Sequence, residues 1–171
     1  MSTEWPKPNP HINDDLAALQ QQFDKWGVKH FTADEVCRLH AISPGEPTHS
    51  CPPPELWGNM RLTIWAADAI RKRWGAPVKV ISGYRPPAYN ARDPKKAKAS
   101  LHMQFGALDL APAKGFASAA DYERWYDLCE DAAVSVAKTA GTAVCTGVGR
   151  YQGRFVHIDV GLRTARARWT G

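Results

Sequence analysis

The stretch SLHMQFGALDL, Ser100–Leu110, places a histidine and an aspartate, His102 and Asp109, among mostly small and apolar residues. On a helix, their Cα atoms would lie about 10 Å apart, a long span for two ligands of one small cation. In a strand, their odd separation would put the two side chains on opposite faces. They converge only if the chain bends between them, and we expect Gly106 to provide that bend. The two residues are therefore either a buried polar pair or two ligands of a metal.

The sequence around this stretch alternates between helical and extended patterns. Helices are predicted over residues 13–27, capped by Asn13, over 31–40, with a capping box from Thr32 to Glu35, over about 54–74, and over 118–141, capped by Ser118. Strands are predicted over residues 77–85 and 107–112 and, as a hairpin with Gln152–Gly153 in its turn, over 145–161. Residues 42–58 and 86–106 indicate loops. This order predicts an α+β fold with a small, mainly antiparallel sheet packed with helices.

The chain has 171 residues, of which 44% are hydrophobic, and this suits one domain with a packed core. We expect a flexible N-terminal arm over residues 1–12 and a single domain over residues 13–171. No segment approaches the ~18 consecutive apolar residues of a membrane helix. The N-terminus lacks the basic start and apolar run of a signal peptide, so we expect synthesis in the cytoplasm.

The net charge of +5 favours an anionic partner, and basic residues gather at 91–98 and 161–169. Each cluster is typical of a solvated surface. Few aromatic residues interleave with them, which argues against recognition of nucleic acid by stacking. We therefore expect no nucleic-acid partner, and we expect a monomer.

The four cysteines, Cys37, Cys51, Cys129 and Cys145, form no CxxC motif, and buried thiols are the simplest interpretation. Two alternatives stay open for the first two cysteines. One is a zinc site formed with His40 and His49, and the other is a Cys37–Cys51 disulfide.

A third candidate metal ligand lies in FVHIDVG, residues 155–161. If this segment is a strand, Val156, Ile158 and Val160 share a face that should be buried, while His157 and Asp159 share the opposite face. His157 alone is more typical of a hydrogen-bonded histidine at a sheet edge. Together with His102 and Asp109, however, it completes two histidines and one aspartate, the composition of a catalytic zinc site with an open fourth position.

Three ordered motifs, SGYRPPAYN, SLHMQFGALD and FVHIDVG, resemble those of the zinc D-Ala-D-Ala carboxypeptidase family, peptidase family M15, and its peptidoglycan endopeptidase branch in particular. The resemblance covers about residues 31–169 and implies a fold like that of Hedgehog and the D-Ala-D-Ala peptidases. It implies that Zn²⁺ is bound by His102, Asp109 and His157.

The resemblance also assigns roles around the metal. Arg85 of SGYR would bind a substrate carboxylate or polarise the scissile carbonyl, which suits a guanidinium. Ser100 would bind substrate or brace its loop, and Tyr84 is a further substrate-binding candidate, although it also suits a role in shaping the loop. Asp159 is the candidate general base for amide hydrolysis, or else it orients His157 or Arg85.

This sequence departs from the family pattern in two places. The family glycine three residues after the first histidine is Phe105 here, and the glycine falls at Gly106. Many relatives carry an acid or a histidine two or three residues before the last ligand, where this chain has Phe155 and Arg154.

The resulting hypothesis is a zinc peptidase that hydrolyses D-amino-acid-containing peptidoglycan peptides. The absence of a signal peptide would suit a phage or prophage endolysin, made in the cytoplasm and released to the cell wall. The alternative is a catalytically impaired metal-binding module of the same fold that binds the wall or has a structural role.

Overall fold

The computed structural model describes residues 9–39, 47–92, 99–142 and 144–171. The helices within these residues are α1 Ile12–Lys25, α2 Ala33–Cys37, the 3-10 helix η1 Pro54–Leu56, α3 Trp57–Trp74, α4 Pro87–Ala91, the 3-10 helix η2 Leu101–Gln104 and α5 Ala119–Thr139. The strands are β1 Val78–Ser82, β2 Ala107–Pro112, β3 Thr146–Tyr151, β4 Phe155–Val160 and β5 Ala167–Thr170.

The strands form one sheet in the order β1-β2-β4-β3-β5. Every neighbouring pair is antiparallel except β3 and β5, which are parallel. The predicted α+β class with a mainly antiparallel sheet is confirmed. Strand β5 was not predicted, because its charged sequence was interpreted as part of a solvated cluster. Alternation in the strand explains this sequence, since Arg168 is exposed while Trp169 is half-buried on the other face.

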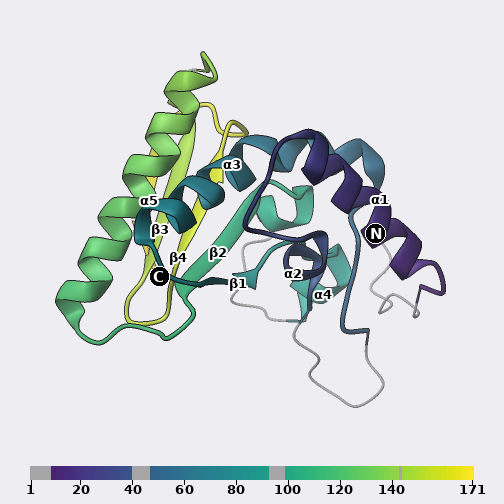
Figure 1. Cartoon of the computed structure of the whole chain (residues 1–171), viewed down its shortest axis with the longest axis horizontal. Coiled ribbons are helices and arrows are strands. Elements are labelled where there is room, and N and C mark those ends of the chain that lie inside the picture. The colour runs from purple at the N-terminus through teal and green to yellow at the C-terminus, as the bar shows by residue number, and fades with distance from the viewer. Residues whose placement is uncertain (1–8, 40–46, 93–98, 143) are drawn as a thin grey trace.

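Helices α3 and α5 cover one face of the sheet and pack against each other (Figure 1). Val156, Ile158 and Val160 of β4 belong to the buried core on this side. The predicted division of β4 into two faces is confirmed, because His157 and Asp159 alternate with these apolar residues and lie on the face away from the helices. The helix layer thus fixes which side of the sheet carries the polar pair.

The predicted starts of two helices are confirmed. Helix α5 begins after Ser118, whose hydroxyl accepts a hydrogen bond from the backbone N–H of Asp121 at 3.1 Å. Helix α2 carries the reciprocal capping box between Thr32 and Glu35. These caps satisfy N–H groups that have no partner within the helix.

The predicted start of the first helix is wrong by two residues, since α1 begins at Ile12 and Asn13 lies inside its first turn. The side chain of Asn9 organises the start instead. It accepts a hydrogen bond from the N–H of His11 at 2.9 Å and donates one to Asp15 at 2.7 Å. Residues 1–8 of the predicted arm lie outside the described residues.

The long loop predicted over residues 86–106 is wrong in part, because it contains α4 and η2. Pro87 occupies the first turn of α4, where a proline is tolerated. Ser100 caps η2 by accepting a hydrogen bond from the N–H of His102 at 3.3 Å. Such short helices have too few residues to show a hydrophobic period.

All four cysteines are free, with Cys37 and Cys129 buried. A hydrogen bond with Cys51 and burial together raise the pKa of the Cys37 thiol well above its ordinary value. The zinc site considered for this region includes His40, which lies outside the described residues. None of the helices in the described part of the chain has the length and apolar character that a membrane span requires.

Thr63 of α3 joins the helix layer to the polar side of the sheet. Its hydroxyl donates to the carbonyl of Gly106 at 2.9 Å and accepts from the N–H of Val160 at 3.0 Å, and the side chain is fully buried. One hydroxyl therefore satisfies two backbone groups that flank the strands carrying Asp109 and His157.

We expect Thr63→Val to lower the free energy of unfolding by about 2–4 kcal/mol, because it leaves a buried N–H and a buried C=O unpaired. Thr63→Ser keeps the hydroxyl and loses one buried methyl group, so it should cost about 1 kcal/mol. Urea unfolding followed by circular dichroism measures both values. Equal losses in the two variants would show that packing of the methyl group, and not the hydrogen bonds, is the larger contribution.

Candidate metal centre

Three side chains from three elements meet on the polar side of the sheet. Asp109 of β2 lies directly opposite His157 of β4 in the antiparallel register, so both project from the same face. His102 comes from η2, immediately before β2. The structure therefore brings together all three metal ligands expected from the sequence, and they form the one group of this kind within the described residues.

The three facing atoms are nearly equidistant. His102 Nε2 lies 3.1 Å from His157 Nδ1 and 3.2 Å from Asp109 Oδ1, and His157 Nδ1 lies 2.9 Å from that same oxygen. Ligand atoms around a tetrahedral ion with bonds of 2.0–2.1 Å lie about 3.3 Å apart. The group is therefore close to the spacing of three ligands of one such ion.

The outer nitrogens of both imidazoles face hydrogen-bond acceptors. His102 Nδ1 lies 2.7 Å from the carbonyl oxygen of Gly83, and His157 Nε2 lies 3.2 Å from Asp159 Oδ2. When the ring protons lie on these outer nitrogens, each inner nitrogen keeps a lone pair. Two lone pairs and a carboxylate oxygen then converge in a buried site, which is the donor set that a divalent transition metal prefers.

Burial and charge act in opposite directions on this group. Burial alone would raise the pKa of Asp109, but the two histidines hold it far below its ordinary value. Burial would lower the pKa of His157, yet hydrogen bonds with Asp109 and Asp159 raise it. For His102, burial is the larger effect and its pKa is lowered. The aspartate is therefore ionised and able to act as an anionic ligand.

The SGYR turn supports His102 from behind. Gly83 accepts the His102 hydrogen bond, and the backbone N–H of Arg85 donates to the His102 carbonyl at 3.1 Å. A Cβ atom on Gly83 would overlap the backbone of Val36 in α2. The glycine is thus required because helix α2 approaches the turn closely, and this contact sets the position of the histidine.

The bend between His102 and Asp109 occurs at Phe105 and not at Gly106, contrary to our expectation. Phe105 has φ 54° and ψ 39°, the left-handed conformation that glycine favours. Its ring is fully buried and packs edge-on against Tyr84. Gly106 serves a different purpose, since a Cβ atom there would overlap Leu162. At the position where the family has glycine, this chain thus has a phenylalanine in a backbone conformation that glycine favours.

A cleft of about 1190 Å³ opens beside the group, and Asp109 and His157 line it. Its described lining also includes the arginines Arg85, Arg154, Arg163 and Arg166 and the aromatic residues Tyr89, Tyr151, Phe155 and Trp169. The carboxylate of Asp109 is the only acidic group among these lining residues. The cleft is therefore basic and partly aromatic.

The expected substrate-binding residues divide between the cleft and the core. Arg85 and Ser100 line the cleft, and Arg85 Nη2 donates to Ser100 Oγ at 3.1 Å. Tyr84 does not line it and is 7% exposed, because its ring packs against Phe105. We therefore assign Tyr84 to the support of the SGYR turn.

Asp159 is fully buried and lies beneath His157. Besides the contact with His157, its carboxylate accepts hydrogen bonds from Arg163 Nε at 2.7 Å and from Arg163 Nη2 at 2.8 Å. Burial would raise the pKa of Asp159, but its hydrogen bonds with His157 and Arg163 lower it. The geometry thus fits the orienting role that we considered for Asp159.

Arg163 and Trp169 were not predicted as neighbours of the site. The ring of Trp169 lies 5.1 Å from that of His157, and the Arg163 guanidinium lies 5.0 Å from the Trp169 ring. The sequence of β3 did contain a sign of these neighbours, because Gly147 and Gly149, two residues apart, lie on the same face of the strand. Glycine within a strand indicates the close approach of another group.

The fold and the geometry define a class of protein, in which a sheet and the 3-10 helix before β2 bring two histidines and one aspartate together beside a cleft, as in a metal-dependent hydrolase. Comparison with known families agrees, because the Peptidase M15 family matches residues 29–159, which include all three residues. The chain belongs to peptidase family M15, a family that is generally metal-dependent. No curated protein matches the sequence.

The strain at Phe105 predicts an unusual order of stability. We expect Phe105→Ala to lower the free energy of unfolding by about 3–5 kcal/mol, since a buried ring is lost. Phe105→Gly loses the same ring but relieves the left-handed backbone, so its loss should be about 1 kcal/mol smaller.

Phe23 is the matched control, because it is equally buried but lies within α1. There Gly should be worse than Ala by about 1 kcal/mol. Urea unfolding of the four variants gives the two differences. The same order at both positions would contradict the role of Phe105 as a strained bend.

Proposed function

We propose that the chain is a zinc-dependent peptidoglycan peptidase that hydrolyses amide bonds in D-amino-acid-containing stem peptides or cross-links. The convergence of three buried donor atoms, from His102, Asp109 and His157, supports a resident ion most directly. Nitrogen and oxygen donors of this kind suit Zn²⁺. When bound, zinc acts as a Lewis acid that polarises a carbonyl and lowers the pKa of a bound water to about 7.

The basic cleft supports an anionic peptide as substrate. Four arginines line it against one carboxylate, so a peptide that carries free carboxylates would be attracted and oriented there. Stem peptides of peptidoglycan carry such carboxylates. The action on the cell wall, after a phage-type release from the cytoplasm, is part of this proposal.

Arg85 is a proposed substrate-binding residue whose backbone is tied to the metal group. Its backbone N–H is fixed to the carbonyl of His102, and its guanidinium donates to Ser100. Ser100 in turn caps η2, the helix that carries His102. A carboxylate or carbonyl oxygen gripped by Arg85 would therefore be held at a defined distance from the metal.

For Asp159, we propose the orienting role and not that of general base. Both of its oxygens accept hydrogen bonds from Arg163, one oxygen also contacts His157, and the residue is not among those lining the cleft. A carboxylate that takes a proton from water needs access to that water. The engaged and buried position of Asp159 favours a supporting role for its carboxylate.

A specific observation favours a second candidate function, a catalytically impaired module that binds the wall. Two and three residues before His157, where many relatives carry an acid or a histidine, this chain has Phe155 and Arg154, and both line the cleft. Neither side chain can accept a proton at neutral pH. Binding without hydrolysis would retain the metal group and the basic cleft.

Metal binding is the first prediction of the proposal. We expect about one zinc ion per chain in the wild-type protein, and far less than one in His102→Ala and His157→Ala, since each loses one of three ligands. Zinc content after dialysis is measured by atomic emission. His30→Ala is the control, because His30 is exposed and distant in sequence from the group. Full zinc content in both ligand variants would show that the site is misassigned.

Hydrolysis of purified sacculi is the experiment that tests the function. The zinc-loaded protein should release muropeptides, and mass spectrometry of the products identifies the bond that is cut. Arg85→Lys should lower kcat/KM by roughly 10–100-fold, because lysine keeps the charge but loses the bidentate grip. Zinc-loaded protein that binds sacculi without releasing any product would establish the wall-binding module instead.

A further inference from the structure

The polar face of the sheet is completed by residues that lie beyond the family match. That match ends at residue 159, whereas Arg163 follows β4 and Trp169 belongs to β5. Both side chains line the cleft and both approach His157 or its partner Asp159. The known properties of the family therefore do not assign a role to either residue.

Arg163 holds the carboxylate that orients His157. The guanidinium donates to both oxygens of Asp159, at 2.7 Å from Nε to Oδ1 and 2.8 Å from Nη2 to Oδ2. Asp159 is 0% exposed, so water cannot replace these bonds. Because Asp159 Oδ2 also faces His157 Nε2 at 3.2 Å, fixing this carboxylate fixes the direction of the imidazole hydrogen bond.

Trp169 supports His157 from β5, across the intervening strand β3. Its indole ring lies over Gly149 of β3, where an added Cβ atom would come within 2.5 Å of the ring. From there it reaches His157, with 5.1 Å between ring centroids, and its Nε1 donates to the hydroxyl of Tyr151 at 3.4 Å. The Arg163 guanidinium stacks over the same indole. Gly147 has a matching purpose, since a Cβ atom there would overlap Asp159 and Arg163.

We propose that Arg163 and Trp169 are positioning residues of the metal centre, which together fix the orientation of His157. This inference rests on the proposed metal site. Arg163 restrains the imidazole through Asp159 at the outer nitrogen, and Trp169 restrains the plane of the ring by contact. Strand β5 is in this view a working part of the site and not only an edge of the sheet.

Two physical effects of Arg163 predict opposite results. If Arg163 acts by positioning, its loss frees Asp159 and weakens metal binding, by roughly 10–100-fold as for other outer partners of metal ligands. If it acts only through its positive charge near the ion, its loss removes a repulsion and tightens metal binding. Arg163→Lys separates the two, because it keeps the charge and loses the planar two-point contact.

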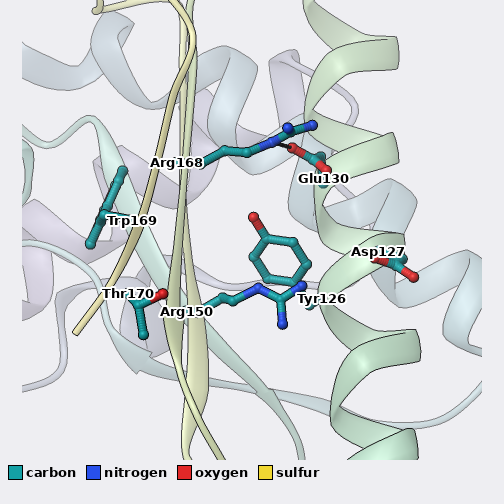
Figure 2. Close-up of a pocket in the computed structure, with 7 residues that line it drawn as sticks. All are labelled: Tyr126, Asp127, Glu130, Arg150, Arg168, Trp169 and Thr170. Atoms are coloured by element: carbon teal, nitrogen blue, oxygen red, sulfur yellow. Dashed lines mark hydrogen bonds and ion pairs between the residues drawn. The ribbon is translucent and has the colours of Figure 1, made fainter.

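The opposite face of β5 provides a matched control (Figure 2). Arg168 points toward α5 and pairs with Glu130, while Trp169 points to the other side of the strand. Burial alone would raise the pKa of Glu130, but hydrogen bonds from Arg168 and Arg166 lower it. Arg168→Gln thus breaks an ion pair in the same strand without touching His157.

The experiment measures the zinc dissociation constant of full-length variants by competition with a chromophoric chelator. We expect Arg163→Gln, Arg163→Lys and Trp169→Ala each to weaken zinc binding by roughly 10-fold or more. Trp169→Phe keeps a ring beside His157 and should restore most of the affinity, and Arg168→Gln should match the wild type. The visible spectrum of the Co²⁺ form should change in the first three variants, because it reports the geometry of the ligands.

Several outcomes separate this inference from the proposed function. A wild-type chain that binds no zinc would refute the metal site itself. Wild-type affinity in Arg163→Lys, or tighter binding in Arg163→Gln, would overturn the positioning role of Arg163, and an unchanged Co²⁺ spectrum in Trp169→Ala would overturn that of Trp169. Circular dichroism and thermal unfolding identify any variant that fails to fold.

If the Trp169→Ala variant is unfolded, Gly149→Ala gives a second test of the role of Trp169. The added methyl group displaces the indole without removing it. As a single change, Gly149→Ala should weaken zinc binding. In the Trp169→Phe variant it should have little further effect, because the smaller ring leaves room for the added methyl group. Additive effects in the double variant would contradict a shared action through the indole.

Discussion

The convergence of two imidazole nitrogens and a carboxylate oxygen is the constraint on which the rest of this structure depends. The three atoms lie within 3.2 Å of one another and lose their hydration on burial. Such a group is stable only when its members are held from outside and when a cation satisfies them from inside. The surrounding fold meets the first requirement with separate supports for each residue, and we propose that zinc meets the second.

The supports differ in kind. Asp109 is placed by the antiparallel register between β2 and β4. A slip of this register by one residue would move its side chain to the other face of the sheet. His102 is placed by the backbone of the SGYR turn, which α2 holds through the close contact at Gly83. His157 is placed by side chains, namely Asp159 and the two residues that follow the family match. Sheet, turn and side chains thus each determine one member of the group.

Much of this arrangement could be predicted from the sequence because it depends on short-range patterns. The alternation in β4 gave the face that carries His157, and the motif around His102 gave the other two residues. What could not be predicted depends on contacts between distant segments. The short helix η2 has too few residues to show a hydrophobic period. The left-handed backbone of Phe105 depends on the burial of its ring. Strand β5 depends on the space that Gly149 of β3 leaves for the Trp169 ring.

Phe105 illustrates how this chain accommodates a departure from its family. A left-handed backbone costs a non-glycine residue about 1–2 kcal/mol. Full burial of a phenylalanine ring contributes about 1.5–3 kcal/mol, which offsets that cost and adds an edge-on contact with Tyr84. Tyr84 belongs to the SGYR turn, so the substitution also couples the bend before Asp109 to the support of His102.

Residues that lie beyond the family match gather around His157. The ligands His102 and Asp109 are held by backbone geometry that the family motifs determine, whereas Arg163 and Trp169 come from a segment outside those motifs. Arg154, in the turn that enters β4, lines the cleft on the same edge, 5.7–5.9 Å from the rings of Phe155 and Tyr151. Because Trp169 both supports a metal ligand and lines the cleft, changes at this residue would alter metal affinity and substrate binding together.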